Sequence, residues 1–192
     1  MNTQTLEDKI FEKIDYSNDK FKNVEFLNCQ FKNCNFSKCD LSNTDFIDCK
    51  FMSCNFSLAN LRNTGLKNIQ FSDCKLIGID FSLCNDFLFT VNFRNCYLDY
   101  ATFFKKKMKK TIFTDCSIKD ADFSETDLTL SEFQNCDLSN TTFAGTNLEK
   151  CDFRSSKNYA FDPEINKIKK AKFSNIGVLG LLAKFDIQIE FE

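Results

Sequence analysis

The side chains most capable of covalent or metal chemistry in this chain are the thiols of its 11 cysteines. Six of them recur every 20 residues, with one longer step of 22 residues: Cys34, Cys54, Cys74, Cys96, Cys116 and Cys136. Cysteines that are brought together can form disulfides or bind a metal ion. A zinc site needs about four converging ligands, and the chain contains no histidine to complete one. What the thiols do therefore depends on how the backbone arranges them.

Phenylalanines follow the same interval, which indicates what that arrangement is. They occupy positions Phe11, Phe31, Phe51, Phe71, Phe93, Phe113, Phe133, Phe153 and Phe173. Between them a large apolar residue recurs at every fifth position, as at Phe36, Leu41 and Phe46, and a small residue stands two positions before it. A period of five within a period of 20 predicts a square solenoid with four five-residue sides per coil. An amphipathic helix would instead need a period of about 3.6 residues.

In such a solenoid the large residue and the small residue point inward, and the three polar residues of each side face water. Equivalent residues of successive coils lie about 4.8 Å apart, so about seven coils form a rod about 35 Å long. The cysteines fill the small inward position, which Thr, Ala, Ser and Val occupy elsewhere. Because stacked Cβ vectors do not converge as a disulfide requires, we interpret the cysteines as small apolar residues. Disulfides and a metal site are the alternatives, and we expect no cofactor.

The five-residue units also carry a motif: a small residue, Asp or Asn, Leu or Phe, and two mostly polar residues. They read CNFSK, TDFID, CNFSL, ANLRN, ADFSE, TDLTL, CDLSN, TNLEK and CDFRS. Across residues 11–173 the chain resembles the pentapeptide-repeat family. That resemblance implies an all-β fold, a right-handed quadrilateral parallel β-helix with a short C-terminal helical cap. We expect a single domain, with the β-helix and an N-terminal cap in residues 1–156 and a C-terminal cap in residues 157–192.

Two segments interrupt the repeat, and such departures are where we look for function. Residues 82–87 carry the two extra residues, and residues 104–110 place Lys106 in a small inward position, where an unpaired ammonium is costly. Both lie on the fourth side of consecutive coils, so we expect them to touch and to set Phe87 beside five lysines. The candidate partner-binding residues are Asn85, Asp86, Phe87, Lys105, Lys106, Lys107, Lys109 and Lys110. The alternative is a tolerated bulge whose lysines extend to water.

An acidic stretch follows the second interruption. The candidate acidic surface consists of Asp115, Asp120, Asp122, Glu125, Asp127, Glu132 and Asp137. Only one basic residue, Lys119, lies among them. This stretch is either an interaction surface or a set of ordinary solvated carboxylates, since the family motif itself favours Asp before the large residue.

The five-residue period fails in the C-terminal segment. Asp162 and Pro163 are typical of a helix start, so we predict a short helix through Lys170. A second helix is predicted at residues 175–184 and a strand at residues 186–191. The segment covers the apolar end of the solenoid. Because relatives in the family dimerise through their C-terminal ends, the resemblance also implies a homodimer; the alternative is a cap alone. The candidate dimerisation residues are Val178, Leu181, Leu182, Phe185, Ile187 and Ile189.

The composition argues against several classes of function. Without histidine there is no His-based acid–base pair or triad, and a chain with five glycines shows no Gly-rich phosphate loop, so we do not expect an enzyme. A net charge of -2 does not fit a polybasic nucleic-acid binder. No apolar run is long enough to span a bilayer, and the N-terminus does not read as a signal peptide. We therefore expect a cytoplasmic protein that binds neither nucleic acid nor membrane directly.

The remaining function class is a non-enzymatic protein-interaction scaffold whose partner the sequence does not name. A second resemblance supplies an alternative. The Cys- and Phe-rich coils, the chain length and the segment Gly177–Leu182 are similar to the quinolone-resistance (Qnr-like) branch of the family. That resemblance implies a DNA-mimicking binder of DNA gyrase or topoisomerase IV that protects against quinolones.

Overall fold

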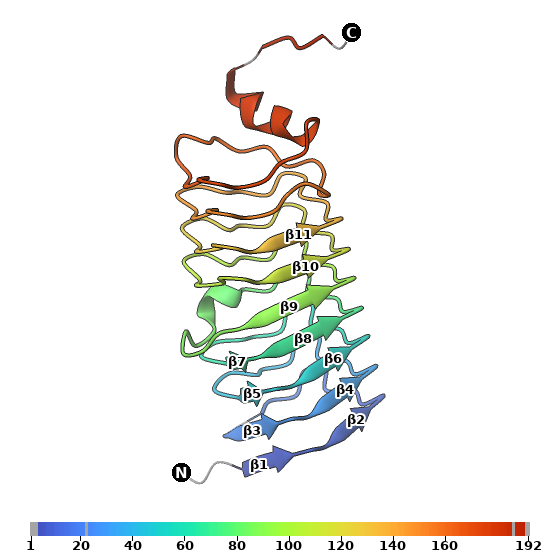
Figure 1. Ribbon diagram of the computed structural model, residues 1–192. Helices are drawn as coiled ribbons and strands as arrows, with labels where there is room; N and C mark the ends of the chain where they lie inside the picture. The colour runs from blue at the N-terminus through green and yellow to red at the C-terminus, as the bar shows by residue number, and fades with distance from the viewer. Residues whose placement is uncertain (1–3, 22, 186, 191–192) are drawn as a thin grey trace.

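The structure is a computed structural model that describes residues 4–21, 23–185 and 187–190. Its backbone winds into a parallel β-solenoid in which successive coils stack along one axis (Figure 1). One side is a 4-stranded sheet of β1 (Gln4–Glu7), β3 (Val24–Leu27), β5 (Asp45–Ile47) and β7 (Gly65–Lys67). The adjoining side is a 7-stranded sheet of β2 (Ile10–Glu12), β4 (Gln30–Lys32), β6 (Lys50–Met52), β8 (Ile69–Ser72), β9 (Val91–Arg94), β10 (Ile112–Thr114) and β11 (Glu132–Gln134). The two other sides carry isolated parallel bridges, such as Asn35 with Asn55.

The register of the sheets confirms the predicted repeat. Phe31 pairs with Phe51, and Phe51 pairs with Phe71, one coil further on. The next pairing joins Phe71 to Phe93, so the longer step is absorbed without loss of register. The 7-stranded sheet takes one strand from each successive coil, so about six full turns separate its first strand from its last.

The core is a set of vertical columns of side chains. Phe113 and Phe133 stack with their ring centroids 4.7 Å apart, and Phe113 meets Phe123 of the opposite side edge-on at 5.9 Å. Both geometries are favourable for aromatic rings. Each five-residue side therefore contributes one large residue that contacts its neighbours both along the axis and around it.

Many of the residues in the small inward position also donate a side-chain hydrogen bond. The Cys54 thiol donates to the Phe31 carbonyl of the previous coil at 3.5 Å, and the Thr64 hydroxyl donates to the Leu41 carbonyl at 2.8 Å. All the cysteines are free and buried. Burial raises the pKa of the Cys49 thiol to about 12, which keeps that thiol protonated near neutral pH. These features support the interpretation of the cysteines as core residues. Within the described residues, no group of His, Cys, Asp or Glu is placed to hold a metal ion.

The corners of the coils explain the abundance of Asn and Asp. Most corners hold a residue in the left-handed region of backbone space, such as Asp48 at φ 55° and Asn68 at φ 54°. Asn and Asp adopt this conformation more readily than most residues. Their side chains also link the coils, because the Asn68 amide donates to the Asp48 carboxylate at 2.6 Å.

The C-terminal segment differs from the prediction in part. The helix predicted through Lys170 is wrong, because the solenoid continues: the Asn166 amide donates to the Phe143 carbonyl at 2.9 Å and the Lys167 N–H to the Thr146 carbonyl at 3.0 Å. Hydrogen bonds to these carbonyls of the previous coil hold the segment in the solenoid, although Asp162 and Pro163 favour a helix start. The Asp162 carboxylate instead accepts the Glu164 N–H at 2.8 Å.

The second predicted helix is present as a 3₁₀ helix, η2 (Gly177–Phe185). It covers the last coil, as predicted, and stands at the C-terminal end of the rod (Figure 1). Of the strand predicted at residues 186–191, the described residues 187–190 form no strand; Asp186 and Phe191 lie outside the described residues. Within the part of the chain that the structure describes, no helix has the length and apolar character needed to cross a bilayer.

Candidate functional site

The first interruption, residues 82–87, forms an ordered bulge on the side of the 4-stranded sheet, in the coil that follows β7. A short 3₁₀ helix, η1 (Phe81–Leu83), leads into it, with the Asp80 carboxylate accepting the Ser82 N–H at 2.9 Å. The Asn85 side chain then accepts the Phe87 N–H at 2.9 Å and turns the chain outward. Figure 1 shows η1 as the green turn beside β9. The repeat spacing locates the two extra residues, but nothing in it predicts η1.

The bulge keeps the core filled and exposes two large apolar side chains. Phe89 turns inward, is buried, and meets Phe81 edge-on at 6.4 Å. Phe87 and Leu88 are left 66% and 63% exposed. The bulge thus presents two adjacent apolar side chains to solvent on a hydrogen-bonded turn.

Lys106 joins the two interruptions, which confirms that they touch. It is 2% exposed, and its ammonium donates to the Asp86 carboxylate at 2.6 Å and to the Cys84 carbonyl. The ring of Phe89 lies 5.1 Å from the same ammonium. A buried ammonium is tolerated only with such partners. Lys106 therefore fastens the bulge of one coil to the inside of the next.

This position corrects two expectations about Lys106. As a buried residue it does not face a partner, and its side chain does not extend to water. Lys105, Lys107, Lys109 and Lys110, by contrast, are exposed as predicted.

Phe87 also lies elsewhere than predicted. Its ring is 5.7 Å from the ammonium of Lys67, on the preceding coil, rather than beside the lysines of residues 105–110. Phe87, Leu88, Lys67 and Ile47 line a hollow of about 490 Å³. The sequence signal for this contact was available: Lys67 stands 20 residues before Phe87, one coil away.

The basic and acidic stretches lie on adjacent coils and pair with each other. Lys105 lies 3.4 Å from Glu125, and Lys109 lies 3.3 Å from Asp127. Such exposed pairs contribute little stability each. They do make this surface a mixture of both charges rather than a basic patch beside an acidic one.

The other acidic candidates are held by hydrogen bonds. Asp115 and Asp120 accept the side-chain amides of Asn135 and Asn140, both at 3.1 Å. The other three carboxylates also accept hydrogen bonds: Asp122 from the Ser124 N–H, Glu132 from the Gln134 side-chain amide, and Asp137 from Ser139 and the Asn158 side-chain amide. Burial opposes the ionisation of Asp137, but these hydrogen bonds and Lys119 outweigh it and hold its pKa at about 2. These carboxylates have structural roles in the corners and ladders.

The candidate dimerisation residues divide into one buried and five exposed side chains. Leu181 is 7% exposed and belongs to the core, so it seals the cap and is not free to contact a second chain. Large side chains remain exposed at Val178, Leu182, Phe185, Ile187 and Ile189. Dimerisation through them stays a prediction.

Comparison with known proteins places this geometry in a family. The family model described as the pentapeptide repeat region matches residues 20–85 and 87–159, more than half of the chain. The chain belongs to the pentapeptide-repeat family. The break between the two matched regions falls at Asp86, inside the bulge. No curated protein matches the chain in a sequence search.

Two solved pentapeptide-repeat structures are similar to this one. HetL, a protein involved in heterocyst differentiation regulation from the cyanobacterium Nostoc sp. strain PCC 7120, has a TM-score of 0.66 at 12% identity, over 90% of this chain and 86% of that chain. A trypsin-treated variant of QnrB1, a plasmid-mediated fluoroquinolone resistance protein, has a TM-score of 0.48 at 22% identity, over 97% of this chain and 100% of that chain. The likeness to HetL shows the fold alone.

Proposed function

We propose that this protein is a non-enzymatic scaffold that binds a protein partner through its bulge and the exposed lysines of the next coil. We define this bulge–lysine surface as residues 85–88 together with Lys105, Lys107, Lys109 and Lys110. The observation that carries the proposal is the buried contact of Lys106 with Asp86, at 2.6 Å. It fixes the bulge before any partner arrives, and a contact surface that is already ordered loses less entropy on binding.

The chemistry of the surface indicates the kind of partner. Phe87 and Leu88 are apolar anchors of the type that fill a pocket at the centre of an interface. The exposed lysines of the next coil would attract acidic residues of the partner and raise the association rate. Among the described residues, Lys107 and Lys110 have no carboxylate within salt-bridge distance, so they are available to a partner. The expected partner is a protein with an apolar pocket and acidic residues beside it.

The alternative function, a DNA-mimicking binder of DNA gyrase or topoisomerase IV, calls for a continuous negative surface. Here Glu125, Asp127 and Asp137 each lie within 3.4 Å of a lysine ammonium. Interleaved charges of both signs favour a partner-specific contact over imitation of a phosphate backbone. We keep this alternative as an outcome of the test.

Reversing the lysine charges is expected to raise the dissociation constant of the partner by about tenfold or more. The test variant carries Lys105→Glu, Lys107→Glu and Lys109→Glu, and a second variant carries Phe87→Ser. Proteins captured from the source cells by the wild type are identified, and dissociation constants are then measured with the purified partner.

The matched control reverses three exposed lysines near the other end of the rod, with Lys9→Glu, Lys13→Glu and Lys38→Glu. It should capture the same partner with unchanged affinity. Identical partners and affinities for wild type and both test variants would remove the bulge–lysine surface from the function. Inhibition of gyrase supercoiling by the purified protein, or relief of fluoroquinolone inhibition, would instead support the alternative.

A further inference from the structure

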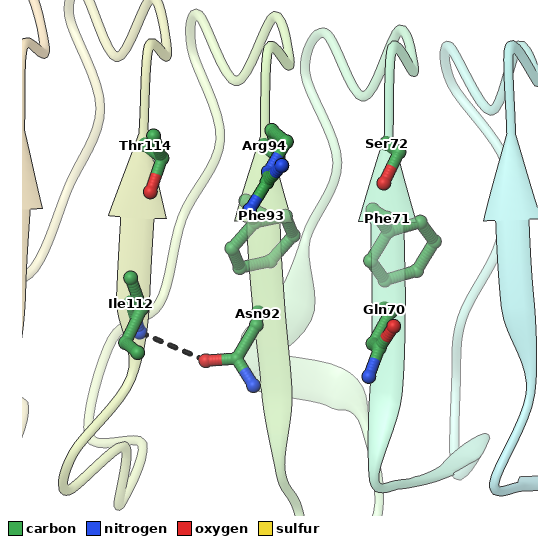
Figure 2. A pocket seen from close by; sticks show the side chains of 8 residues that line it. All are labelled: Gln70, Phe71, Ser72, Asn92, Phe93, Arg94, Ile112 and Thr114. Atoms are coloured by element: carbon green, nitrogen blue, oxygen red, sulfur yellow. Dashed lines mark hydrogen bonds between the residues drawn. The ribbon is translucent and has the colours of Figure 1, made fainter.

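A second surface feature lies on the 7-stranded sheet, where no site was predicted. Strands β8, β9 and β10 line a hollow of about 420 Å³, shown from close by in Figure 2. Its polar side chains are Gln70, Ser72, Asn92, Arg94 and Thr114, and Ile112 closes one side. No carboxylate lines it.

The hollow arises where the longer coil rejoins the sheet. Strand β10 pairs with β9 at Phe113 and Thr114 only, whereas the pairing of β8 with β9 extends over four positions. The Ile112 N–H donates instead to the Asn92 side-chain oxygen at 2.9 Å (Figure 2). Because the oxygen of Asn92 is used in this way, its amide N–H groups are left to face the hollow.

The spacing of the aromatic column is wider at the same place. The rings of Phe71 and Phe93 are 5.4 Å apart, against 4.8 Å for Phe31 and Phe51. The longer coil is thus accommodated in the core by a wider ring spacing, while β8 and β9 stay paired.

Arg94 is the group in this hollow that lacks a counterion. Its side chain stands in one row with Ser72 and Thr114 (Figure 2). Across the described residues, no carboxylate lies within salt-bridge distance of its guanidinium. An exposed guanidinium with five donors and no acceptor is suited to an external anion.

A second arginine, Arg154, lies on the same side of the solenoid and binds a carboxylate. Arg154 binds the carboxylate of Asp152, with Nε at 3.0 Å from one oxygen and Nη2 at 2.7 Å from the other. The ladder of paired residues places Asn92 in the row of Asp152, three coils away. The chain thus repeats the arginine but replaces its carboxylate partner with a neutral amide.

We propose that the Arg94 hollow binds the carboxylate of a Glu or Asp side chain on an extended acidic segment of a partner protein. The guanidinium fork takes the two oxygens as Arg154 takes Asp152, and the Asn92 amide and the Ser72 hydroxyl are further donors. A carboxylate fits better than a phosphate, because phosphate sites commonly use several free backbone N–H groups, whereas the Ile112 N–H at this hollow already donates to Asn92. The hollow lies on a different side of the rod from the bulge–lysine surface, so this inference does not rest on the proposed function.

The proposal is tested by following the arginine side-chain NMR resonances while a peptide is added. The chain has only three arginines, Arg62, Arg94 and Arg154, so their Nε–H resonances are few in an NMR spectrum. The Arg94 resonance is assigned by its loss in Arg94→Gln. The probe is a peptide of alternating Glu and Ser, and the control peptide has Gln in place of Glu. We expect the Glu peptide to shift the Arg94 resonance and to bind at least about fivefold more tightly than the Gln peptide.

Two variants on the same sheet side sharpen the test. Asn92→Asp places a carboxylate in the position relative to Arg94 that Asp152 has relative to Arg154. It should therefore weaken binding of the Glu peptide about fivefold. Arg154→Gln, which removes an arginine that is already paired, should leave the affinity unchanged. The absence of a shift at Arg94, or equal affinity in Asn92→Asp, would overturn the proposal. A shift produced by inorganic phosphate at a lower concentration than by the Glu peptide would overturn the choice of a carboxylate.

Discussion

Replacing Phe113 with alanine is expected to lower the free energy of unfolding by about 3–5 kcal/mol. Phe113 is 0% exposed and stacks between Phe93 and Phe133, with ring centroids 5.3 Å and 4.7 Å away. It also meets edge-on the rings of Phe103 and Phe123, which stack in the column of the opposite side. Because every rung packs on the rungs above and below it, the remaining side chains cannot close the cavity without moving the coils. Equilibrium denaturation in urea measures the loss.

The matched control is Phe104→Ala, which removes the same side chain from the surface of the preceding coil. Phe104 is 37% exposed and contacts the ammonium of Lys105. Its removal should cost less than about 1 kcal/mol. A loss of less than about 1 kcal/mol for Phe113→Ala would mean that the phenylalanine column is not the core.

Removing the carboxylate of Asp86 is expected to cost about 3 kcal/mol, a large effect for a side chain that is 82% exposed. The cost arises at Lys106, because Asp86→Ala leaves a buried ammonium with only the Cys84 carbonyl and the Phe89 ring as partners among the described residues. Adding Lys106→Met should restore most of the lost stability, since it removes the charge and keeps the volume of the side chain. Urea denaturation of the single and double variants measures the coupling.

The comparison for this prediction is an exposed pair in the same region. Lys109→Ala breaks the contact with Asp127 at 3.3 Å and should cost at most about 0.5 kcal/mol. If Asp86→Ala costs no more than Lys109→Ala, the Lys106 contact does not hold the bulge. If Asp86→Ala is destabilising as expected, it should also weaken partner binding, because the bulge then loses its fixed shape.

The solenoid was predictable from sequence because its packing allows little variation. A coil of four short sides must present a large residue at each side and a small one two positions earlier, so the period is visible in the chain itself. The Phe71-to-Phe93 step and the Cys74-to-Cys96 step located the same extra residues independently, and the sheet register confirms them. Non-local pairing at a fixed interval is in this respect easier to predict than ordinary tertiary contacts.

What the sequence did not predict depends on which groups meet across coils. The Asp162–Pro163 signal is local, and it was overridden by carbonyls of the previous coil. The inward lysine was recognised as costly, but its partner Asp86 was not identified, since a bulge does not follow the repeat. The Arg94 hollow could have been found by comparing equivalent positions, because Asn92 and Asp152 occupy the same row.

The vertical register of the coils is tested most directly by the positions of the sulfur atoms in a crystal, located from their anomalous scattering. The sulfurs of Cys34, Cys54, Cys74, Cys96, Cys116 and Cys136 are expected in one nearly straight row, about 4.8 Å apart, with no displacement at the longer coil. Sulfurs of Cys54 and Cys74 in unrelated parts of the molecule, or a break in the row between Cys74 and Cys96, would contradict the fold, and with it both proposed surfaces.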